Sequence, residues 1–377
     1  MPLSIKRRAA GHSTLWATLT RPIWSSTMDL CGSRSAARRS DRPTLRAMRE
    51  LLAAALLVSL TPACAWAGSA PAVRSPAAHA ATARAGPTGA GRMGSACGVT
   101  PAVAPGTSAE QQVAVDPQVQ LGHARRSYRL HVPVRYAAMQ PVPVLLDSHG
   151  YGGSAAGEEK GSSYDHLADR DGFLAVYPQG LTAQDAPGWA SAARLDLGVD
   201  EIAYFGAVLD QLERQFCVDQ RRVYATGFSN GGGMTEMLAC YLSDRIAAVA
   251  PVSGNYYLAA KQRCRPPRPV AILATHGTAD PVIPYAGVSR AENPGWPLLS
   301  IPDFMASWAA RDGCQSEPVT FLDSQDVTGL RWEGCVGGVS VVHYRWNGGG
   351  HALPAEIGGD PASEVIWSFL ASHSLLV

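Results

Sequence analysis

The sequence lacks three features that would assign it to common classes of protein. Its apolar run from Leu51 to Leu60 is too short to span a membrane. No Cys-x-x-Cys pair and no His-x-x-x-His pair occurs, so we expect no structural zinc site. An excess of positive charge is also missing. The formal net charge is +1, and residues 1–67 hold ten Lys and Arg against three Asp and Glu, which leaves −6 for the remainder. Such an acidic remainder has no electrostatic footprint for nucleic acid or for an anionic membrane.

The N-terminal part reads as a leader. Residues 48–67 combine a basic start, a short apolar run and an Ala65-Trp66-Ala67 end, which predicts a signal peptide cleaved after Ala67 and a secreted, extracellular protein. Residues 1–47 are rich in Arg and Ser and lack periodicity. We therefore predict that translation starts at Met48 and that residues 1–47 are an over-extended, unstructured N-terminus. A lipid anchor at Cys64 is the weaker alternative, because the residues before it match a lipobox poorly.

Six cysteines follow the leader, and their even number in a secreted chain favours disulfides. They are Cys97, Cys217, Cys240, Cys264, Cys314 and Cys335. Six cysteines allow fifteen pairings. We favour Cys314–Cys335, which closes a short loop, and leave the other pairings open.

Residues 68–106 are rich in Ala, Pro, Gly and Ser and predict a disordered linker. Cys97 lies within this linker, so a disulfide can tie its end to the folded domain. Residues 107–377 then form one domain of a size that is ordinary for α/β folds.

Within residues 107–377, short β-prone runs alternate with helical patterns. The predicted strands are Arg126–Pro133, Val142–Asp147, Phe173–Tyr177, Arg222–Thr226, Ile246–Val252, Val270–Thr275 and Val339–Trp346. The predicted helices are Tyr164–Asp171, Asp200–Phe216 with Asp200 as its N-cap, Met234–Leu242, Pro302–Asp312 and Ala362–His373. This alternation predicts an α/β fold with a mostly parallel, doubly wound sheet flanked by helices. Ligands of such sheets bind at the carboxyl ends of the strands.

One strand and the next helix are joined by Gly227-Phe228-Ser229-Asn230-Gly231. This is the G-x-S-x-G pattern of a nucleophile elbow, in which a strained turn lifts the serine hydroxyl above the sheet. A Cβ at either flanking glycine would collide with the opposite arm of the turn. The alternative is an ordinary glycine-rich loop, so the elbow needs an acid and a histidine that follow in order.

Both follow at strand ends. Asp280 lies in His-Gly-Thr-Ala-Asp after one predicted strand, and His351 lies in Gly-Gly-Gly-His after the last. The order Ser229, Asp280, His351 is that of α/β-hydrolases. Imidazole can take the serine proton near neutral pH, and the aspartate fixes its tautomer and stabilises the imidazolium.

Four rival residues receive structural interpretations. His343 lies within a predicted strand and His373 in the last predicted helix, where a histidine is usually packed or exposed without a role in chemistry. Asp303 is better explained as a helix cap, and His276 as a structural residue on the loop of the acid.

The oxyanion hole needs two N–H donors placed where charge develops. We expect the first from Asn230, directly after the nucleophile. The second is expected from Tyr151, on the loop that follows His149-Gly150.

Several segments resemble secreted esterases of the poly(3-hydroxybutyrate) depolymerase and feruloyl esterase group, which are carbohydrate esterase family 1-like α/β-hydrolases. The resembling segments are SHGYGGSA, LADRDGFLAVYPQG, FCVDQRRVYATGFSNGGGM, IAAVAPVSG, HGTADPVIPYAG and YRWNGGGHALP. The resemblance implies ester hydrolysis through an acyl-enzyme, with Ser229, Asp280 and His351 at the matching positions. It also implies that no metal or organic cofactor is needed.

Two departures from the family pattern concern the substrate site. The family often has His-Thr-Trp-Pro at the histidine, whereas this chain has His351-Ala-Leu-Pro and so loses a flat apolar wall. The elbow helix starts with Gly231-Gly-Gly-Met, and the extra glycine is expected to widen the acyl pocket. Trp189 and His149 are the predicted substrate contacts; a packed loop tryptophan is the alternative for Trp189.

We therefore predict a secreted serine carboxylic-ester hydrolase that acts on feruloyl or acetyl esters of plant polysaccharide, or on hydroxyalkanoate esters. No appended substrate-binding module is visible, which favours soluble esters or oligomers over a solid polyester. The alternatives are a serine peptidase of the same fold, which normally carries a large gating domain, and a non-catalytic hydrolase-like binding protein, which typically loses the serine or histidine. Neither nucleic acid nor membrane is an expected partner, and the oligomeric state stays open.

Overall fold

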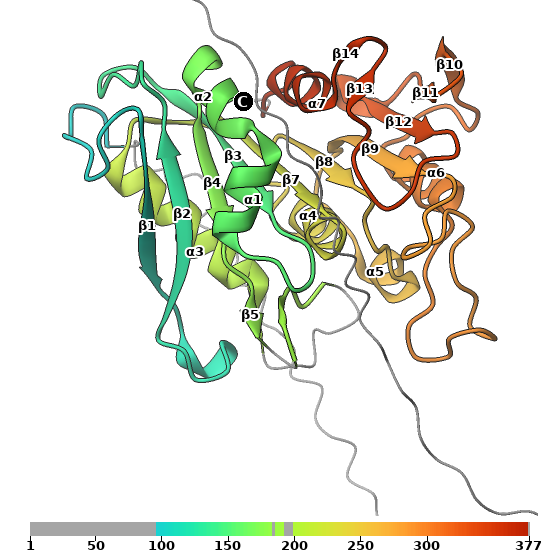
Figure 1. Ribbon diagram of the computed structural model, residues 1–377, viewed down its shortest axis with the longest axis horizontal. Coiled ribbons are helices and arrows are strands. Elements are labelled where there is room, and N and C mark those ends of the chain that lie inside the picture. The colour runs from blue at the N-terminus through green and yellow to red at the C-terminus, as the bar shows by residue number, and fades with distance from the viewer. Residues whose placement is uncertain (1–95, 183–184, 192–198, 376–377) are drawn as a thin grey trace, which may run out of the picture. The chain divides into compact units, whose positions relative to one another are not determined.

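A computed structural model of the chain describes residues 96–182, 185–191 and 199–375. The predictions for residues 1–95 (the over-extended N-terminus, the signal peptide and most of the linker) lie outside the described residues. In the described part, ten strands form one sheet in the order β1-β2-β4-β3-β7-β8-β9-β12-β11-β10 (Figure 1). Strands β4 through β12 in this order run parallel, whereas β1, β2, β11 and β10 make antiparallel pairs at the two edges.

The bounds of the elements agree with most predicted positions. The strands of the sheet are β1 Thr107–Ala114, β2 Arg125–Val132, β3 Val142–Ser148, β4 Leu174–Pro178, β7 Val218–Phe228, β8 Ala248–Val252, β9 Ala271–Gly277, β10 Val319–Asp323, β11 Val327–Trp332 and β12 Val341–Trp346. The helices are α1 Ala155–Ser162, α2 Tyr164–Asp171, α3 Glu201–Gln215, α4 Asn230–Tyr241, α5 Leu258–Arg263, α6 Ile301–Arg311 and α7 Ala362–Ala371. Short elements complete the described part: β5 Leu181–Thr182, β6 Pro187–Gly188, β13 Glu356–Ile357, β14 Asp360–Pro361 and the 3₁₀ turns Pro117–Val119 and Val336–Gly338.

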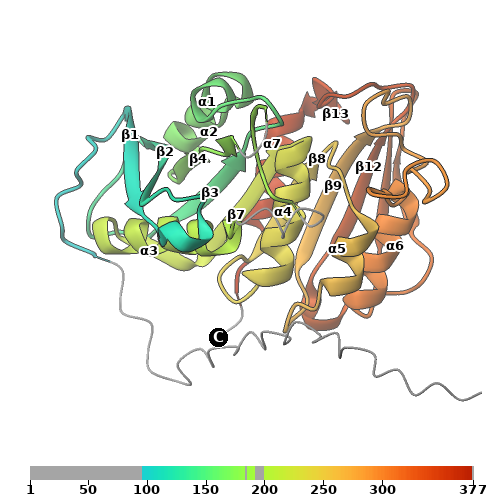
Figure 2. The same ribbon diagram turned by 90° about the horizontal axis from the view of Figure 1, so that it is seen from below.

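Helices cover both faces of the sheet, which explains why its central strands are continuous apolar runs (Figure 2). On β3, Val144 and Leu146 pack with α3, α4 and α6, whereas Leu145 packs on the opposite face with α1, α2 and α7. All residues of β3 and β9 are buried. The doubly wound α/β fold is therefore confirmed.

The helix starts show the local chemistry that the sequence predicts. The Asp200 side chain accepts a hydrogen bond from the Ala203 N–H at 2.9 Å, which confirms it as the N-cap of α3. At α6 the N-cap is Ser300, and Asp303 accepts a hydrogen bond from its hydroxyl at 2.7 Å. Asp303 thus belongs to the capping arrangement of α6, although it is not itself the N-cap.

Sequence patterns missed the outer strands. β1 and β10 are largely exposed, so their apolar alternation is weak. They gain their partners by adding antiparallel to β2 and β11 at the sheet edges. β7 also runs longer than predicted, from Val218 to Phe228, because Val218 already pairs with Val142 of β3. The register then shifts, and regular pairing with β3 resumes at Val223.

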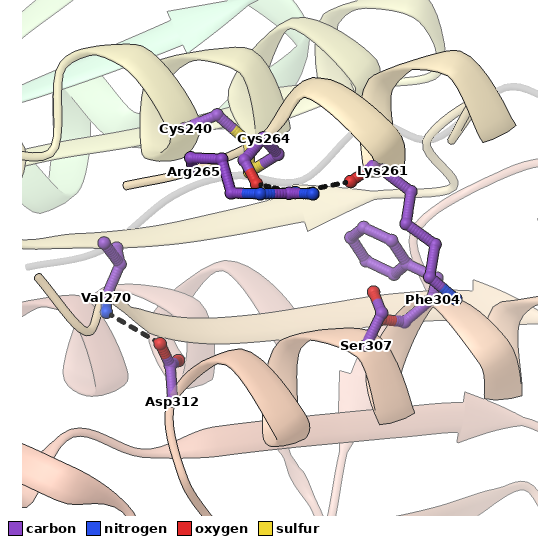
Figure 3. Close-up of a disulfide and its surroundings, with 8 residues drawn as sticks. All are labelled: Cys240, Lys261, Cys264, Arg265, Val270, Phe304, Ser307 and Asp312. Atoms are coloured by element: carbon purple, nitrogen blue, oxygen red, sulfur yellow. Dashed lines mark hydrogen bonds between the residues drawn. A yellow bond between two sulfur atoms is a disulfide. The ribbon is translucent and has the colours of Figure 1, made fainter. Parts of the chain in front are cut away.

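Among the described residues, three disulfides join segments that are separated in the sequence. Cys314–Cys335 is confirmed, and the others are Cys97–Cys217 and Cys240–Cys264. Figure 3 shows Cys240 on α4 bonded to Cys264, which directly follows α5, with the Arg265 guanidinium donating to the Cys264 carbonyl at 2.8 Å.

Residues 96–106, which the sequence assigns to the linker, are held against the domain. The Cys97–Cys217 disulfide fixes their start next to β7, and Val103 is buried in the core. The folded domain therefore includes residues N-terminal to the predicted boundary at residue 107.

Candidate active site

Ser229 occupies a strained turn between β7 and α4. Its φ of 56° and ψ of −117° lie in a region that non-glycine residues seldom adopt. A Cβ at Gly227 would lie 2.7 Å from the Gly231 carbonyl oxygen, and a Cβ at Gly231 would run into the Ser148 carbonyl. Both glycines are thus required for β3, β7 and α4 to approach so closely, as the elbow pattern predicts.

The three predicted side chains meet at the carboxyl ends of β7, β9 and β12. The Ser229 Oγ lies 2.9 Å from Nε2 of His351, and His351 Nδ1 lies 2.7 Å from Oδ2 of Asp280. The Asp280 side chain is fully buried, whereas 15% of the His351 side chain is exposed. This continuous chain of hydrogen bonds can move a proton from the serine hydroxyl to the imidazole.

Asp280 and His351 are held by contacts between their own loops. Oδ1 of Asp280 accepts hydrogen bonds from the Val282 and Ile283 N–H groups, both at 2.8 Å, which leaves Oδ2 for the imidazole. The Ala279 N–H donates to the Gly349 carbonyl at 2.9 Å, and this hydrogen bond joins the acid loop to the histidine loop. The His351 ring also packs against Phe228, with ring centroids 4.8 Å apart.

The rival histidines have other partners. His276 is fully buried, with Nε2 2.9 Å from the Ile283 carbonyl and 3.3 Å from Asp280 Oδ2. Burial lowers the pKa of His276, which favours a neutral ring beside the acid. His343 lies between the Tyr285 hydroxyl and the Ala274 carbonyl, each at 2.9 Å, and burial lowers its pKa to about 4.

His373 is likewise occupied locally, since its Nδ1 lies 2.8 Å from the Phe369 carbonyl at the end of α7. These contacts agree with the structural interpretations of all three histidines.

The two predicted oxyanion donors flank the serine. Asn230 is the first residue of α4, where a helix leaves its N–H groups without intrahelical acceptors and presents its positive dipole end. On the other side, a Cβ added to Gly150 would lie 3.4 Å from the Ser229 Cβ, so the loop that carries Tyr151 runs directly beside the serine. The role of both N–H groups stays a prediction.

Hydrogen bonds hold Asn230 and the loop that carries Tyr151 against residues 185–191. The amide of Asn230 accepts a hydrogen bond from the Trp189 N–H at 2.7 Å and donates to the Ser191 hydroxyl at 3.1 Å. The Tyr151 hydroxyl donates to the Asp185 carboxylate, and the Gly152 N–H donates to the Pro187 carbonyl at 2.7 Å. The chain around residues 185–191 thus braces both predicted donors.

Of the two predicted substrate contacts, Trp189 lines the pocket at Ser229 and His149 does not. Trp189 lines the pocket described below, but it is 3% exposed and its Nε1 donates to the His149 carbonyl at 2.8 Å. His149 is 1% exposed and is not among the described residues that line this pocket. Its Nε2 accepts from the Gly180 N–H at 3.0 Å, which leaves Nδ1 to donate to the Gly150 carbonyl at 2.7 Å. The geometry therefore argues against a substrate contact by His149 and gives it a positioning role under the Gly150–Tyr151 loop.

A pocket of about 360 Å³ opens at Ser229. The described residues that line it are Tyr151, Leu181, Asp185, Ala186, Gly188, Trp189, Ala190, Ser191, Val199, Glu201, Ser229, Asn230, Asn255, Tyr257, Val282 and Ile283. Sequence reasoning missed Asn255 and Tyr257, although both follow β8 and therefore lie at the ligand-binding edge of the sheet. Tyr257 accepts a hydrogen bond from Asn255 Nδ2 at 3.1 Å.

A buried ion pair supports the floor of this pocket. Arg126 Nη1 lies 2.5 Å from Oε2 of Glu201, and both side chains are almost fully buried. Burial raises the pKa of Glu201, and the adjacent Arg126 opposes that rise. The Arg126 guanidinium also lies over the ring of Tyr204, 3.6 Å from its centroid. The pair joins β2 to the first residue of α3, and Glu201 Oε1 also accepts a hydrogen bond from the Ala190 N–H at 3.4 Å, next to Trp189.

Among residues 96–182, 185–191 and 199–375, no group of three or more His, Cys, Asp or Glu side chains is arranged to hold a metal ion. Within the same ranges, none of the helices has the length and apolar character to cross a membrane.

A parallel sheet with a serine elbow, and with acid and histidine following on later strand ends, defines the α/β-hydrolase class. A solved acetyl xylan esterase from Aspergillus awamori shares this fold, with a TM-score of 0.51 and 18% identity over 70% of this chain and 99% of that one. Residues 126–299 match the family model described as Esterase PHB depolymerase.

Curated relatives agree with this match. The probable feruloyl esterase C of Aspergillus oryzae is 30% identical over 65% of this chain and 83% of its own length. Feruloyl esterase B of Piromyces equi is 31% identical over 64% of this chain, which spans 44% of that relative. The bifunctional acetylxylan esterase/xylanase XynS20E of Neocallimastix patriciarum is 28% identical over 67% of this chain and 34% of its own length. The chain belongs to the esterase PHB depolymerase family and is a carboxylic ester hydrolase. Its three disulfides fit a secreted protein.

Proposed function

We propose that the chain hydrolyses esters through an acyl-enzyme in which Ser229 is the nucleophile, His351 the general base and Asp280 the residue that orients the histidine. The observation that carries this proposal is the pair of contacts from Ser229 Oγ to His351 Nε2 at 2.9 Å and from His351 Nδ1 to Asp280 Oδ2 at 2.7 Å. The strained backbone of Ser229 supports it, because strain of this kind clusters at functional sites.

In the first half-reaction, Ser229 Oγ attacks the ester carbonyl carbon while His351 Nε2 takes the hydroxyl proton. The N–H groups of Asn230 and Tyr151 receive the negative charge that develops on the carbonyl oxygen. When the tetrahedral intermediate collapses, the bond to the alcohol oxygen breaks and His351 gives that oxygen its proton. Water then repeats the sequence on the acyl-enzyme, and the products are the free acid and regenerated Ser229.

The substrate class that we propose is feruloyl or acetyl esters of plant polysaccharide, with hydroxyalkanoate esters as the second candidate. The names of the relatives support the first class, since two carry the name feruloyl esterase and one the name acetylxylan esterase. The pocket of about 360 Å³ is much larger than an acetyl group needs, and it is lined by Tyr151, Trp189 and Tyr257. Within this class, a flat aromatic acyl group uses that wall best.

Secretion into an extracellular, oxidising environment is part of the proposal. The three disulfides support it, because such bonds persist outside the reducing cytosol. The signal-like residues 48–67 support it from the sequence side.

The decisive experiment compares the wild-type chain with the Ser229→Ala variant on p-nitrophenyl acetate, methyl ferulate, acetylated xylan, hydroxybutyrate oligomers and a peptide amide. We expect turnover of esters, loss of at least a thousandfold in the variant and an unchanged circular dichroism spectrum. A fluorophosphonate probe should label Ser229 in the wild type. Ester turnover that survives Ser229→Ala would refute the proposed nucleophile. Preference for the peptide amide would support the peptidase, and inactivity of a folded wild type the binding protein.

A further inference from the structure

A second cavity lies on the other side of the nucleophile strand from the helix α4. Its volume is about 460 Å³, and its wall includes Asp147 of β3, Glu158 and Ser162 of α1, and Thr226 of β7. Successive residues of a strand point to opposite faces, so Asp147 shares the face of Leu145, which is covered by α1, α2 and α7. The cavity is therefore separate from the pocket at Ser229.

The acidic side chains of this cavity have no basic counterpart among the described residues that line it. Asp147 is 2% exposed, and its Oδ2 has no hydrogen-bond partner among the described residues. The buried Ser162 hydroxyl lies close enough to Asp147 to oppose the rise in its pKa, but it brings no positive charge. The charged neighbour that acts most on Asp147 is a second carboxyl group, Glu158. No Arg, Lys or His occurs among the described residues that line the cavity. A buried carboxylate is usually paired with a cation or bound to a metal.

We propose that this cavity binds one calcium ion through the carboxylates of Asp147 and Glu158 and the hydroxyl of Ser162. Calcium takes six to eight oxygen ligands in flexible geometry, and the volume leaves room for waters to complete the set. These donors are hard oxygens, and neither His nor Cys is among them, which disfavours zinc and copper. Magnesium fits less well because it demands near-octahedral geometry and loses its waters reluctantly.

Access to the proposed site is available from the solvent. Asp147 lies at the buried end, whereas Glu158 and Ser162 are partly buried and Ser163 is exposed. Hydrated calcium can thus reach the cavity along α1 and exchange its waters for the buried carboxylate.

The site adjoins the serine elbow from behind. Gly227 and Phe228 form part of the cavity wall, and the Phe228 ring packs against His351. Leu353 and Pro354, which follow His351 closely, form another part of the wall. Bound calcium would stabilise the packing on which the elbow rests. The proposal concerns stability and does not depend on the proposed esterase mechanism.

Protons compete with calcium at this site. Calcium binds carboxylates in their ionised form, so a proton on Asp147 or Glu158 opposes its binding. The tyrosines that feel the Asp147 charge, Tyr164 and Tyr177, stay neutral because burial raises the pKa of each hydroxyl further. Calcium should therefore bind better at pH 8 than at pH 5.

The test uses the full-length chain, freed of metal with a chelator that is then removed, and measures Tm at pH 8 with and without millimolar CaCl₂. We expect calcium to raise Tm by roughly 5 °C. MgCl₂ at the same concentration controls for ionic strength and should raise Tm by less than half as much. Isothermal titration calorimetry with CaCl₂ should give one site per chain, with weaker binding at pH 5.

Asp147→Asn should abolish both the Tm shift and the heat of binding. The same change removes an uncompensated buried charge, so it should raise the Tm of the calcium-free protein. Asp323→Asn, at an exposed carboxylate on β10, is the matched control and should respond to calcium like the wild type. If Asp147→Asn does not fold, Glu158→Gln replaces it.

Three results would overturn the proposal. A wild type whose Tm does not respond to calcium at pH 8 binds none at a useful affinity. A shift that persists in both Asp147→Asn and Glu158→Gln places the ion elsewhere. A Tm that rises on acidification to pH 6 and ignores calcium at every pH assigns the pair to a shared proton instead.

Discussion

The Asp280 carboxylate meets the His351 imidazole with one specific oxygen. Oδ2 lies 2.7 Å from His351 Nδ1, while Oδ1 accepts hydrogen bonds from two backbone N–H groups at 2.8 Å. Because the two carboxylate oxygens have different partners, an asparagine at position 280 would be held in one orientation of its side-chain amide.

Asp280→Asn should therefore inactivate the site through the tautomer of His351. The backbone N–H groups of Val282 and Ile283 require an acceptor, so the amide oxygen takes the place of Oδ1 and the NH₂ group faces His351. Nδ1 must then accept, Nε2 carries the proton, and the serine proton has no base. We expect kcat to fall by roughly 10³ to 10⁴ with Tm nearly unchanged. Steady-state rates on p-nitrophenyl acetate check this, and a loss smaller than tenfold would contradict the assigned role.

Gly231→Ala should destabilise the fold as well as remove activity. The added methyl group would meet the Ser148 carbonyl, which belongs to the adjacent β3 backbone and cannot rotate away. We expect a loss of about 3 kcal/mol or more in the free energy of unfolding, measured by urea denaturation. Gly206→Ala in α3 is the control, because its Cβ would meet nothing within 4 Å. The control should gain up to about 1 kcal/mol, as expected for a helical glycine.

Tyr257→Ala should change substrate preference. Tyr257 forms part of the pocket wall, so its loss removes apolar contact from a large acyl group but little from an acetyl group. We expect kcat/KM for methyl ferulate to fall about tenfold, equivalent to about 1.4 kcal/mol, and that for p-nitrophenyl acetate to change less than twofold. Tyr241→Ala, at the exposed end of α4, should leave both values unchanged. Equal losses on the two substrates would show that Tyr257 supports the machinery and not the acyl pocket.

Glu236→Gln should stabilise the protein at alkaline pH. Burial within α4 raises the pKa of Glu236 to about 8 from 4.5, and Arg311 only partly opposes this. The folded state thus binds more protons than the unfolded state between these values, so stability falls as pH rises through this window. The glutamine variant escapes that loss and should gain on the order of 3 kcal/mol at pH 9, with little gain at pH 4. Chemical denaturation at the two pH values checks the difference between variant and wild type. An equal gain at both pH values would point to packing instead of ionisation.

The sequence by itself determined the class of fold and which three side chains meet at the carboxyl ends of the strands. Buried parallel strands are continuous apolar runs, and the elbow must place glycines on both sides of Ser229. Each of these features is therefore visible in a short stretch of neighbouring residues. Asp280 and His351 could be found because catalytic residues of such sheets follow the strand ends in a fixed order. The pairing of Cys314 with Cys335 could be inferred because the loop between them is short.

Tertiary structure decided what depends on contacts between distant segments. The edge strands β1 and β10 are exposed and gain their pairing only from neighbours, so their own residues carry little signal. His149 looked like a substrate contact beside Gly150, yet a hydrogen bond from Gly180 holds its ring in the interior. The same holds for Asp147: a carboxylate at the end of an apolar strand gives no hint of its surroundings, because Glu158 and Ser162 reach it through the packing of α1 on the sheet. Local patterns specify local geometry, whereas burial and charge environment are properties of the assembled layers.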